Sequence, residues 1–175
     1  MELPSDPALH PDVAALSFLL GTWRGTGEGQ YPTVDPFRYG EEMTFTHVGD
    51  PFLAYEQKSW SLDDESPLHF ERGFLRGGET GAVELVLAHP LGIVELSTGR
   101  LSGVGGSRVI DLTSAMMAHT PTGEPVTALE RHLEIEGDAM VYTLDMEMER
   151  VPLSSHLRAE LRRRVSSGER APHVG

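Results

Sequence analysis

The sequence contains no cysteine, and this absence excludes several kinds of chemistry at once. Without a thiol there is no disulfide, no thiolate ligand for iron and no cysteine nucleophile. Long apolar runs are also missing, since none approaches the roughly 20 residues of a membrane-spanning helix. Residues 1–12 have neither the basic region nor the apolar region of a secretory signal. We therefore expect a cytoplasmic protein without a membrane partner.

Basic residues are scarce, with 14 Lys and Arg against 27 Asp and Glu and a net charge of −13. Nucleic-acid binding requires a basic surface that displaces counterions from phosphates, and docking on anionic lipid requires one too. The composition therefore argues against a nucleic-acid partner and against a membrane partner. Residues 158–170 carry a local excess of arginine, for which a solvated terminus and a partner contact are alternative explanations.

The chain does contain many short runs of strand character, separated by turn residues. A short helix is predicted at residues 12–20, with Asp12 as its N-cap and Gly21 as its stop. The predicted strands are residues 23–27, 41–48, 52–60, 70–76, 83–89, 93–97, 108–115, 127–135 and 140–148. The last run alternates most clearly, because Met140, Tyr142 and Leu144 share one face with Met146 and Met148.

Nine or ten antiparallel strands must close or stack to protect their edges. A sandwich and an up-and-down barrel would both do this, and the even spacing of the hairpins favours the barrel. A barrel of this size encloses more space than side chains fill, so we expect a ligand cavity. The prediction is one all-β domain over residues 12–164, between a flexible N-terminus (1–11) and a flexible tail (165–175).

Eight histidines are the only imidazole ligands that the chain offers. None of their spacings is that of a dedicated zinc motif. His10, His119 and His173 lie in or beside turns and termini and are expected to be exposed, whereas His47, His69 and His89 could each be a satisfied core histidine. His156 follows the apolar strand and Pro152, beside a wall that contains Met146 and Met148, where a large flat apolar ligand could bind. A structural role and a metal-ligand role for His156 both remain open on these grounds.

A family resemblance rests on motifs that occur in order along the chain. Residues 21–27 (GTWRGTG) match a G-x-W-x-G-x-G signature. Further matches lie at residues 31–33, 36–42, 47–55, 84–90, 92–95, 126–128 and 152–161. With this ordered set, which covers about residues 14 to 164, the chain resembles the nitrobindin family.

The resemblance implies a ten-stranded β-barrel of calycin or lipocalin shape, similar to the fatty-acid-binding proteins. Such barrels hold haem b, usually ferric, in a solvent-accessible site at the barrel mouth. The resemblance makes His156 the proximal axial ligand of the haem iron. It makes Thr33, Phe37, His69, His89 and Met146 the pocket wall.

Family members convert peroxynitrite to nitrate and bind nitric oxide reversibly in the ferrous state. We therefore expect a haem-dependent peroxynitrite isomerase with no catalytic group beyond the iron held by His156. A non-enzymatic carrier of a fatty acid or another apolar molecule, and a haem or nitric oxide sensor, are the alternatives. A family tendency towards dimers also allows a homodimer. Glu124 departs from the family, because many relatives carry lysine there.

The strand pattern around His156 conflicts with an inward orientation of its side chain. In a regular strand over residues 156–164, His156 shares a face with Arg158 and Glu160, while Leu157 and Ala159 take the apolar face. Two interpretations follow: either the bend at Pro152 places His156 before the regular strand, or the haem lies at the rim of the barrel.

Overall fold

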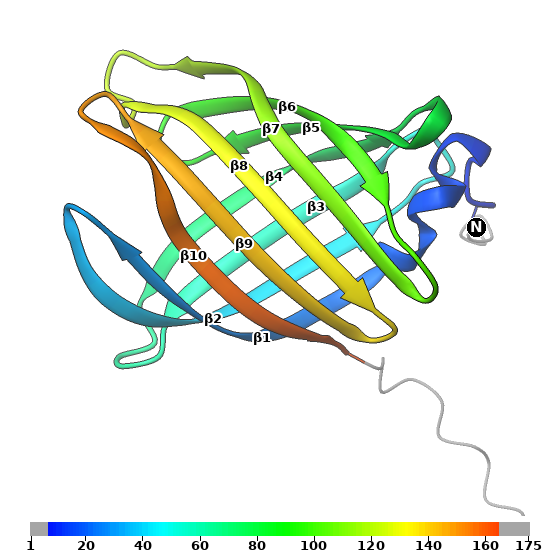
Figure 1. The fold of residues 1–175 in the computed structure, drawn as a ribbon, viewed down its shortest axis with the longest axis horizontal. Coiled ribbons are helices and arrows are strands. Elements are labelled where there is room, and N and C mark those ends of the chain that lie inside the picture. Colours follow the sequence, from blue (N-terminus) through cyan, green and yellow to red (C-terminus); the bar gives the residue numbers. More distant parts are fainter. Residues whose placement is uncertain (1–6, 165–175) are drawn as a thin grey trace, which may run out of the picture.

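The computed structural model describes residues 7–164, which contain ten strands and two 3-10 helices, a longer one near the N-terminus and the short η2 (Glu79–Gly81). The strands are β1 (Gly21–Tyr31), β2 (Val34–Thr46), β3 (Leu53–Ser61), β4 (Pro67–Gly77), β5 (Ala82–His89), β6 (Ile93–Ser102), β7 (Ser107–His119), β8 (Val126–Glu136), β9 (Ala139–Met148) and β10 (Val151–Arg163). Each strand pairs antiparallel with its neighbours in the sequence, and β1 pairs with β10 to close a barrel (Figure 1). The predicted up-and-down barrel is confirmed.

The N-terminal element is a 3-10 helix, η1 (Pro11–Leu19), rather than a helix that Asp12 caps. His10 is the N-cap, because its Nδ1 accepts a hydrogen bond from the backbone N–H of Asp12 at 3.2 Å. The side chain of His10 is 34% exposed, so it is partly rather than fully exposed. A 3-10 helix has three residues per turn, so Val13, Leu16 and Leu19 lie on one face, and all three are buried.

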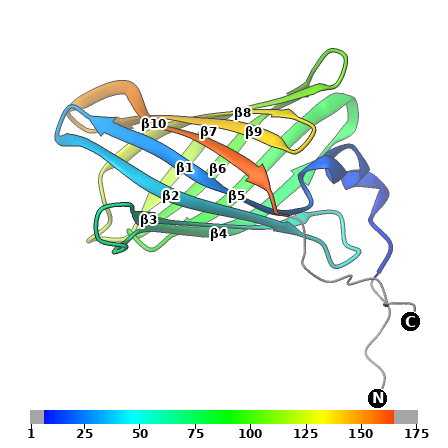
Figure 2. The ribbon, with the colours of Figure 1, turned by 90° about the horizontal axis from the view of Figure 1, so that it is seen from below.

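Helix η1 closes one end of the barrel, the end at which β10 finishes (Figures 1 and 2). The indole N–H of Trp23 donates to the carbonyl oxygen of Leu19 at 2.8 Å. The guanidinium of Arg163 lies 4.1 Å from the centroid of the Trp23 ring and donates to the carbonyl of Phe18 at 2.6 Å. These contacts join the helix to the first and last strands, so this end is sealed by packing.

The glycines of the first motif lie where β1 runs against β10 and β2. A Cβ atom at Gly25 would collide with the backbone of Glu160, and one at Gly27 would collide with the ring of Tyr39. The motif therefore spaces glycines where a neighbouring strand or ring approaches the backbone of β1 too closely for a side chain.

The barrel interior has three levels between η1 and the opposite end. Apolar side chains such as Met43, Phe45 and Leu75 fill the level next to η1. A layer of buried polar groups follows: Glu41, Gln57, Glu71, Glu95, Arg131 and Tyr142. Beyond this layer lies a cavity at the end formed by the β1–β2 and β9–β10 hairpins. Among residues 7–164, no helix has the length and apolar character needed to cross a membrane.

Candidate functional site

The cavity at the hairpin end has a volume of about 650 Å³. This lies within the range of roughly 300–1,000 Å³ that is typical of small-molecule and cofactor pockets. Its apolar lining consists of Val34, Phe37, Tyr39, Leu68, Leu91, Ile93, Val126, Leu129, Leu144, Met146 and Leu157. Its polar lining comprises Asp35, Gln57, Ser59, His69, Glu71, His89, Arg131, Tyr142 and His156. A large apolar ligand with few polar contacts suits such a lining.

Five of the six residues predicted for the pocket line this one cavity: Phe37, His69, His89, Met146 and His156. They come from β2, β4, β5, β9 and β10, so only the closed barrel brings them together. Thr33 is different, because it lies exposed in the turn between β1 and β2 and is not among the residues that line the cavity. Its neighbour Val34 lines the cavity in its place.

His156 is the extra residue of a β-bulge. Ser155 pairs with Asp145 and Leu157 pairs with Leu144, so His156 has no partner of its own on β9. A bulge redirects side chains, and both His156 and Leu157 line the cavity as a result. The bulge explains the conflict in the strand pattern, and it lies inside β10, so the interpretation that His156 precedes the strand is wrong.

The side chain of His156 bonds to the backbone of β1 where that strand separates from β10. The last pair between these strands is Gly29 with Leu157, and the Nδ1–H of His156 donates to the carbonyl of Gln30 at 3.0 Å. A carbonyl can only accept, so this bond fixes the proton on Nδ1 and leaves the lone pair of Nε2 free. Burial lowers the pKa of His156, which keeps the imidazole neutral. Both effects suit a metal ligand.

Two aromatic rings fix the orientation of the His156 imidazole. The centroid of the Tyr31 ring lies 5.4 Å from the centroid of the imidazole, and that of Phe37 lies 6.4 Å from it, both in edge-on arrangements. The hydroxyl of Tyr31 donates to the carbonyl of Met146 at 3.2 Å, and this bond connects the Tyr31 ring to β9. The imidazole is therefore positioned before any ligand binds.

The floor of the cavity is a buried ion network centred on Arg131. Its guanidinium donates to Glu71 at 2.9 and 3.0 Å, and to Glu95 at 2.8 and 3.2 Å. Burial raises the pKa of each carboxyl, but Arg131 together with the neighbouring histidines His69 and His89 outweighs it, lowering the pKa of Glu95 to about 2 and that of Glu71 further. Both carboxylates are therefore ionised, and the network has two negative charges against one positive charge.

A third buried carboxyl, Glu41, lies beside this network with fewer partners. Its Oε1 accepts from the Gln57 amide at 2.8 Å. Within residues 7–164, its Oε2 has no hydrogen-bond partner, and the same holds for the hydroxyl of Tyr39. Burial raises the pKa of Glu41 to about 7, so this group is easily protonated near neutral pH.

Among residues 7–164, the other histidines do not line the cavity. His47 follows the end of β2 and is half-buried; among the described residues its Nδ1 has no hydrogen-bond partner, so it is not a satisfied core histidine. His119 is exposed as predicted, with its Nε2 donating to the carbonyl of Val126 at 2.6 Å. His132 pairs with Asp111 on the outer surface. His173 lies outside the described residues.

Sequence reasoning missed the charged residues of the floor. Arg131 lies between Leu129 and Leu133 on the same side of β8, and all three are buried. Glu71 and Glu95 likewise occupy inward positions of β4 and β6. A charged residue at an apolar position of an alternating strand was the available signal, and it indicates a buried ion pair.

The residues present fit a haem. A neutral imidazole with a free Nε2 faces a cavity whose lining is mostly apolar, as a porphyrin requires. Held by Tyr31 and Phe37, His156 could supply one axial bond, and Phe37, Leu144, Met146 and Leu157 could contact the faces and edges of the ring.

Comparisons with known proteins agree with this fit. The family model of the THAP4-like, haem-binding β-barrel domain matches residues 12–163. A protein named peroxynitrite isomerase 2 from Mycobacterium marinum is 49% identical, covering 93% of this chain and 99% of its own. A peroxynitrite isomerase from Nocardia farcinica is 47% identical, covering 89% and 93%.

A solved structure agrees as well. The crystal structure of Rv2717c from M. tuberculosis superposes with a TM-score of 0.87 at 45% identity, covering 90% of this chain and 100% of the other. The resemblance to the nitrobindins is thereby confirmed. The chain belongs to the THAP4-like family of haem-binding β-barrels.

Proposed function

We propose that this protein is a haem-dependent peroxynitrite isomerase in which His156 binds the iron of ferric haem b at the barrel mouth. The observation that carries the proposal is the geometry of His156. A bulge turns its side chain to the cavity, and the bond from Nδ1 to Gln30 leaves Nε2 free. The names of the relatives from M. marinum and N. farcinica support the reaction.

The chain's own groups bind and orient in this proposal rather than transfer protons. Tyr31 and Phe37 fix the imidazole plane, and the apolar lining excludes water from the cofactor. When bound, the haem supplies a Lewis-acidic iron for the rearrangement of peroxynitrite to nitrate. His156 would hold the haem iron, the cavity would admit small ligands beside the cofactor, and binding of nitric oxide in the ferrous state belongs to the same proposal.

Haem titration of His156→Ala tests the axial ligand. We expect wild type to bind one haem with a sharp Soret band and the variant to bind at least 100-fold more weakly, with an unchanged circular dichroism spectrum. His132→Ala is the matched control, because this imidazole lies on the outer face of β8 and pairs with Asp111. An unaltered Soret band in His156→Ala would show that another residue binds the iron.

Added imidazole sharpens this test. The space left in His156→Ala is lined by Tyr31 and Phe37, so free imidazole should restore the Soret position of the wild type. Peroxynitrite decay, with nitrate quantified, should follow haem occupancy across all samples. Haem binding without faster decay would favour a sensor, and absence of a Soret band in wild type would favour a carrier of apolar molecules.

A further inference from the structure

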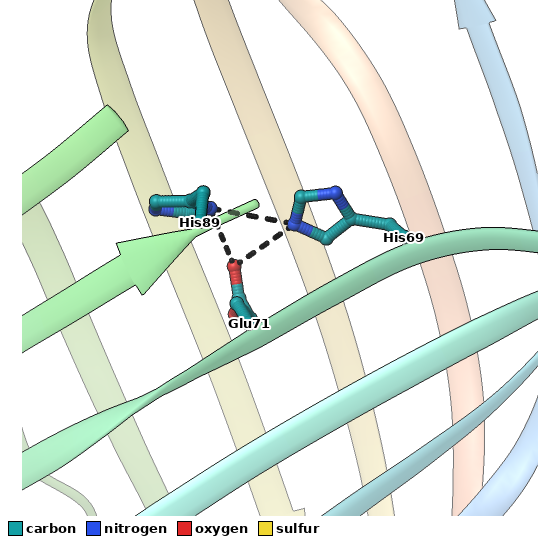
Figure 3. A group of neighbouring side chains, drawn as sticks. All are labelled: His69, Glu71 and His89. Atoms are coloured by element: carbon teal, nitrogen blue, oxygen red, sulfur yellow. Dashed lines mark hydrogen bonds and ion pairs between the residues drawn. The ribbon is translucent and has the colours of Figure 1, made fainter. Parts of the chain in front are cut away.

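Three side chains on the cavity wall place their ligand atoms in a nearly equilateral triangle. His69 and Glu71 are two residues apart on β4, and His89 ends the adjacent strand β5 (Figure 3). His89 Nδ1 lies 3.3 Å from His69 Nε2 and 3.3 Å from Glu71 Oε2, and the third side of the triangle is 3.5 Å. Among residues 7–164 this is the one group of three such side chains with converging ligand atoms.

The size of the triangle matches one coordination geometry. Ligands that bind Zn²⁺ at about 2.0–2.1 Å in a tetrahedron lie roughly 3.3–3.4 Å from one another. An octahedral ion with bonds of similar length would bring neighbouring ligands to about 3.0 Å. We propose that His69 Nε2, Glu71 Oε2 and His89 Nδ1 form a tetrahedral site for a divalent first-row transition cation, with Zn²⁺ as the reference ion.

Hydrogen bonds to residues outside the triangle leave a lone pair on two of its three ligand atoms, His89 Nδ1 and Glu71 Oε2. The Nε2–H of His89 donates to Glu95 at 3.2 Å, which puts the proton of the neutral ring there and leaves Nδ1 as an acceptor. Glu71 Oε2 accepts one bond, from Arg131 at 3.0 Å, and keeps a second lone pair towards the histidines. A carboxylate behind a ligating histidine is the usual support of a metal site.

The surroundings also favour a cation with an open coordination position. Glu71 and Glu95 carry two negative charges and Arg131 carries one positive charge, so the network keeps a net charge of −1. Glu71 is further held by the hydroxyl of Tyr55 at 2.7 Å, so the carboxylate does not need to move. His69 borders the cavity with 29% of its side chain exposed, and the fourth position would therefore face the cavity. Two nitrogens and one oxygen disfavour Mg²⁺ and Ca²⁺, which prefer oxygen ligands.

This site is independent of the proposed haem ligand, since it uses no atom of His156. The test is a titration of the haem-free full-length chain, treated with chelator, with Zn²⁺ by calorimetry and with Co²⁺ by visible absorption. We expect one ion per chain and the intense visible bands of tetrahedral Co²⁺. His69→Gln and His89→Gln should each weaken Zn²⁺ binding at least tenfold, whereas His156→Ala and His132→Ala should retain the wild-type affinity.

Several results would overturn the site. Equal loss in His156→Ala would place the ion at the haem ligand, and weak octahedral Co²⁺ bands would exclude the tetrahedral triangle. Absence of binding at pH 7.5 would show that a shared proton, rather than a cation, occupies the space between the three atoms. Because His89 is buried, its substitution could unfold the barrel; His69→Gln, at the cavity border, then decides the question together with a Zn²⁺-dependent rise in the melting temperature of wild type alone.

Discussion

The two halves of the barrel interior are built from the same ten strands but use them differently. Next to η1, inward positions carry Met43, Leu75 and Ile110, which are at most 3% exposed. Towards the hairpin end, the same strands carry Phe37, His69 and Met146 around a cavity. Apolar burial in the closed half stabilises the fold, so the open half can retain a space that no side chain fills. If this division holds, substitutions in the closed half should change stability and substitutions in the open half should change haem binding.

Arg131 lies at the boundary between the two halves, and its removal should have the largest effect. In Arg131→Met, the buried carboxylates of Glu71 and Glu95 lose the guanidinium that pairs with both of them. Breaking a buried pair in this way costs about 3–5 kcal/mol of unfolding free energy. Urea denaturation would measure the loss. Arg72→Met is the matched control, because Arg72 is mostly exposed and its ion pair with Glu56 contributes about 0–1 kcal/mol. Equal losses in both variants would contradict a structural role for the buried network.

Leu16 tests the closed half alone. This residue is 1% exposed, so Leu16→Ala should cost about 2–5 kcal/mol of unfolding free energy, while the haem affinity of the folded protein stays unchanged. Leu91→Ala, at the cavity rim and 46% exposed, should do the reverse, with less than about 0.5 kcal/mol of stability lost and weaker haem binding. If Leu16→Ala weakened haem binding as much as Leu91→Ala, the two halves would not be separable.

The inward face of the barrel strands was the easiest feature to predict from the sequence. The alternation of Met140, Tyr142 and Leu144 indicates an inward face, and the structure buries all three. The predicted starts at residues 41 and 70 were too late, since β2 begins at Val34 and β4 at Pro67. Pro36 and Pro67 lie within the first residues of β2 and β4, where proline is tolerated.

The site depends on pairings that no local pattern contains. The bulge at His156 exists only relative to β9, and its bond to Gln30 joins residues 126 positions apart. The partners Glu71 and Arg131 are 60 positions apart. Local sequence shows that a charged residue occupies an inward position, but only closure of the barrel decides which opposite charge meets it. The family resemblance does not depend on such local patterns. It predicted that His156 faces the pocket, whereas the alternation of apolar residues predicted an outward side chain.

Glu41 makes the floor of the cavity sensitive to pH. Burial raises its pKa to about 7 in the folded state, against 4.5 for the ordinary group, with Glu71 raising it and Gln57 and Arg131 lowering it. The folded state therefore binds the proton more tightly, and stability falls as pH rises from about 4.5 to about 7. Glu41→Gln should remove this fall and add on the order of 3 kcal/mol at pH 8, measured by urea denaturation across this pH range.

An exposed glutamate provides the control for this pH effect. Glu134 lies on the outer side of β8, so Glu134→Gln should leave the stability profile of the wild type unchanged. The difference between the two variants isolates the buried carboxyl from the other groups that titrate. A profile for Glu41→Gln that parallels the wild type would assign the pH dependence to other groups.

The smallest effect is expected at Thr33, where the family resemblance and the structure make different predictions. The resemblance implies a pocket residue, but Thr33 lies exposed in the β1–β2 turn, whereas Phe37 lines the cavity and contacts the His156 ring edge-on. We expect Thr33→Val to change the haem dissociation constant less than about threefold and Phe37→Ala to raise it about tenfold, since tenfold corresponds to 1.4 kcal/mol. Haem titrations of both variants decide the matter. An equal rise in the haem dissociation constant in both variants would mean that the β1–β2 turn closes over the bound haem. The cavity wall of the open half would then form fully only when haem is bound.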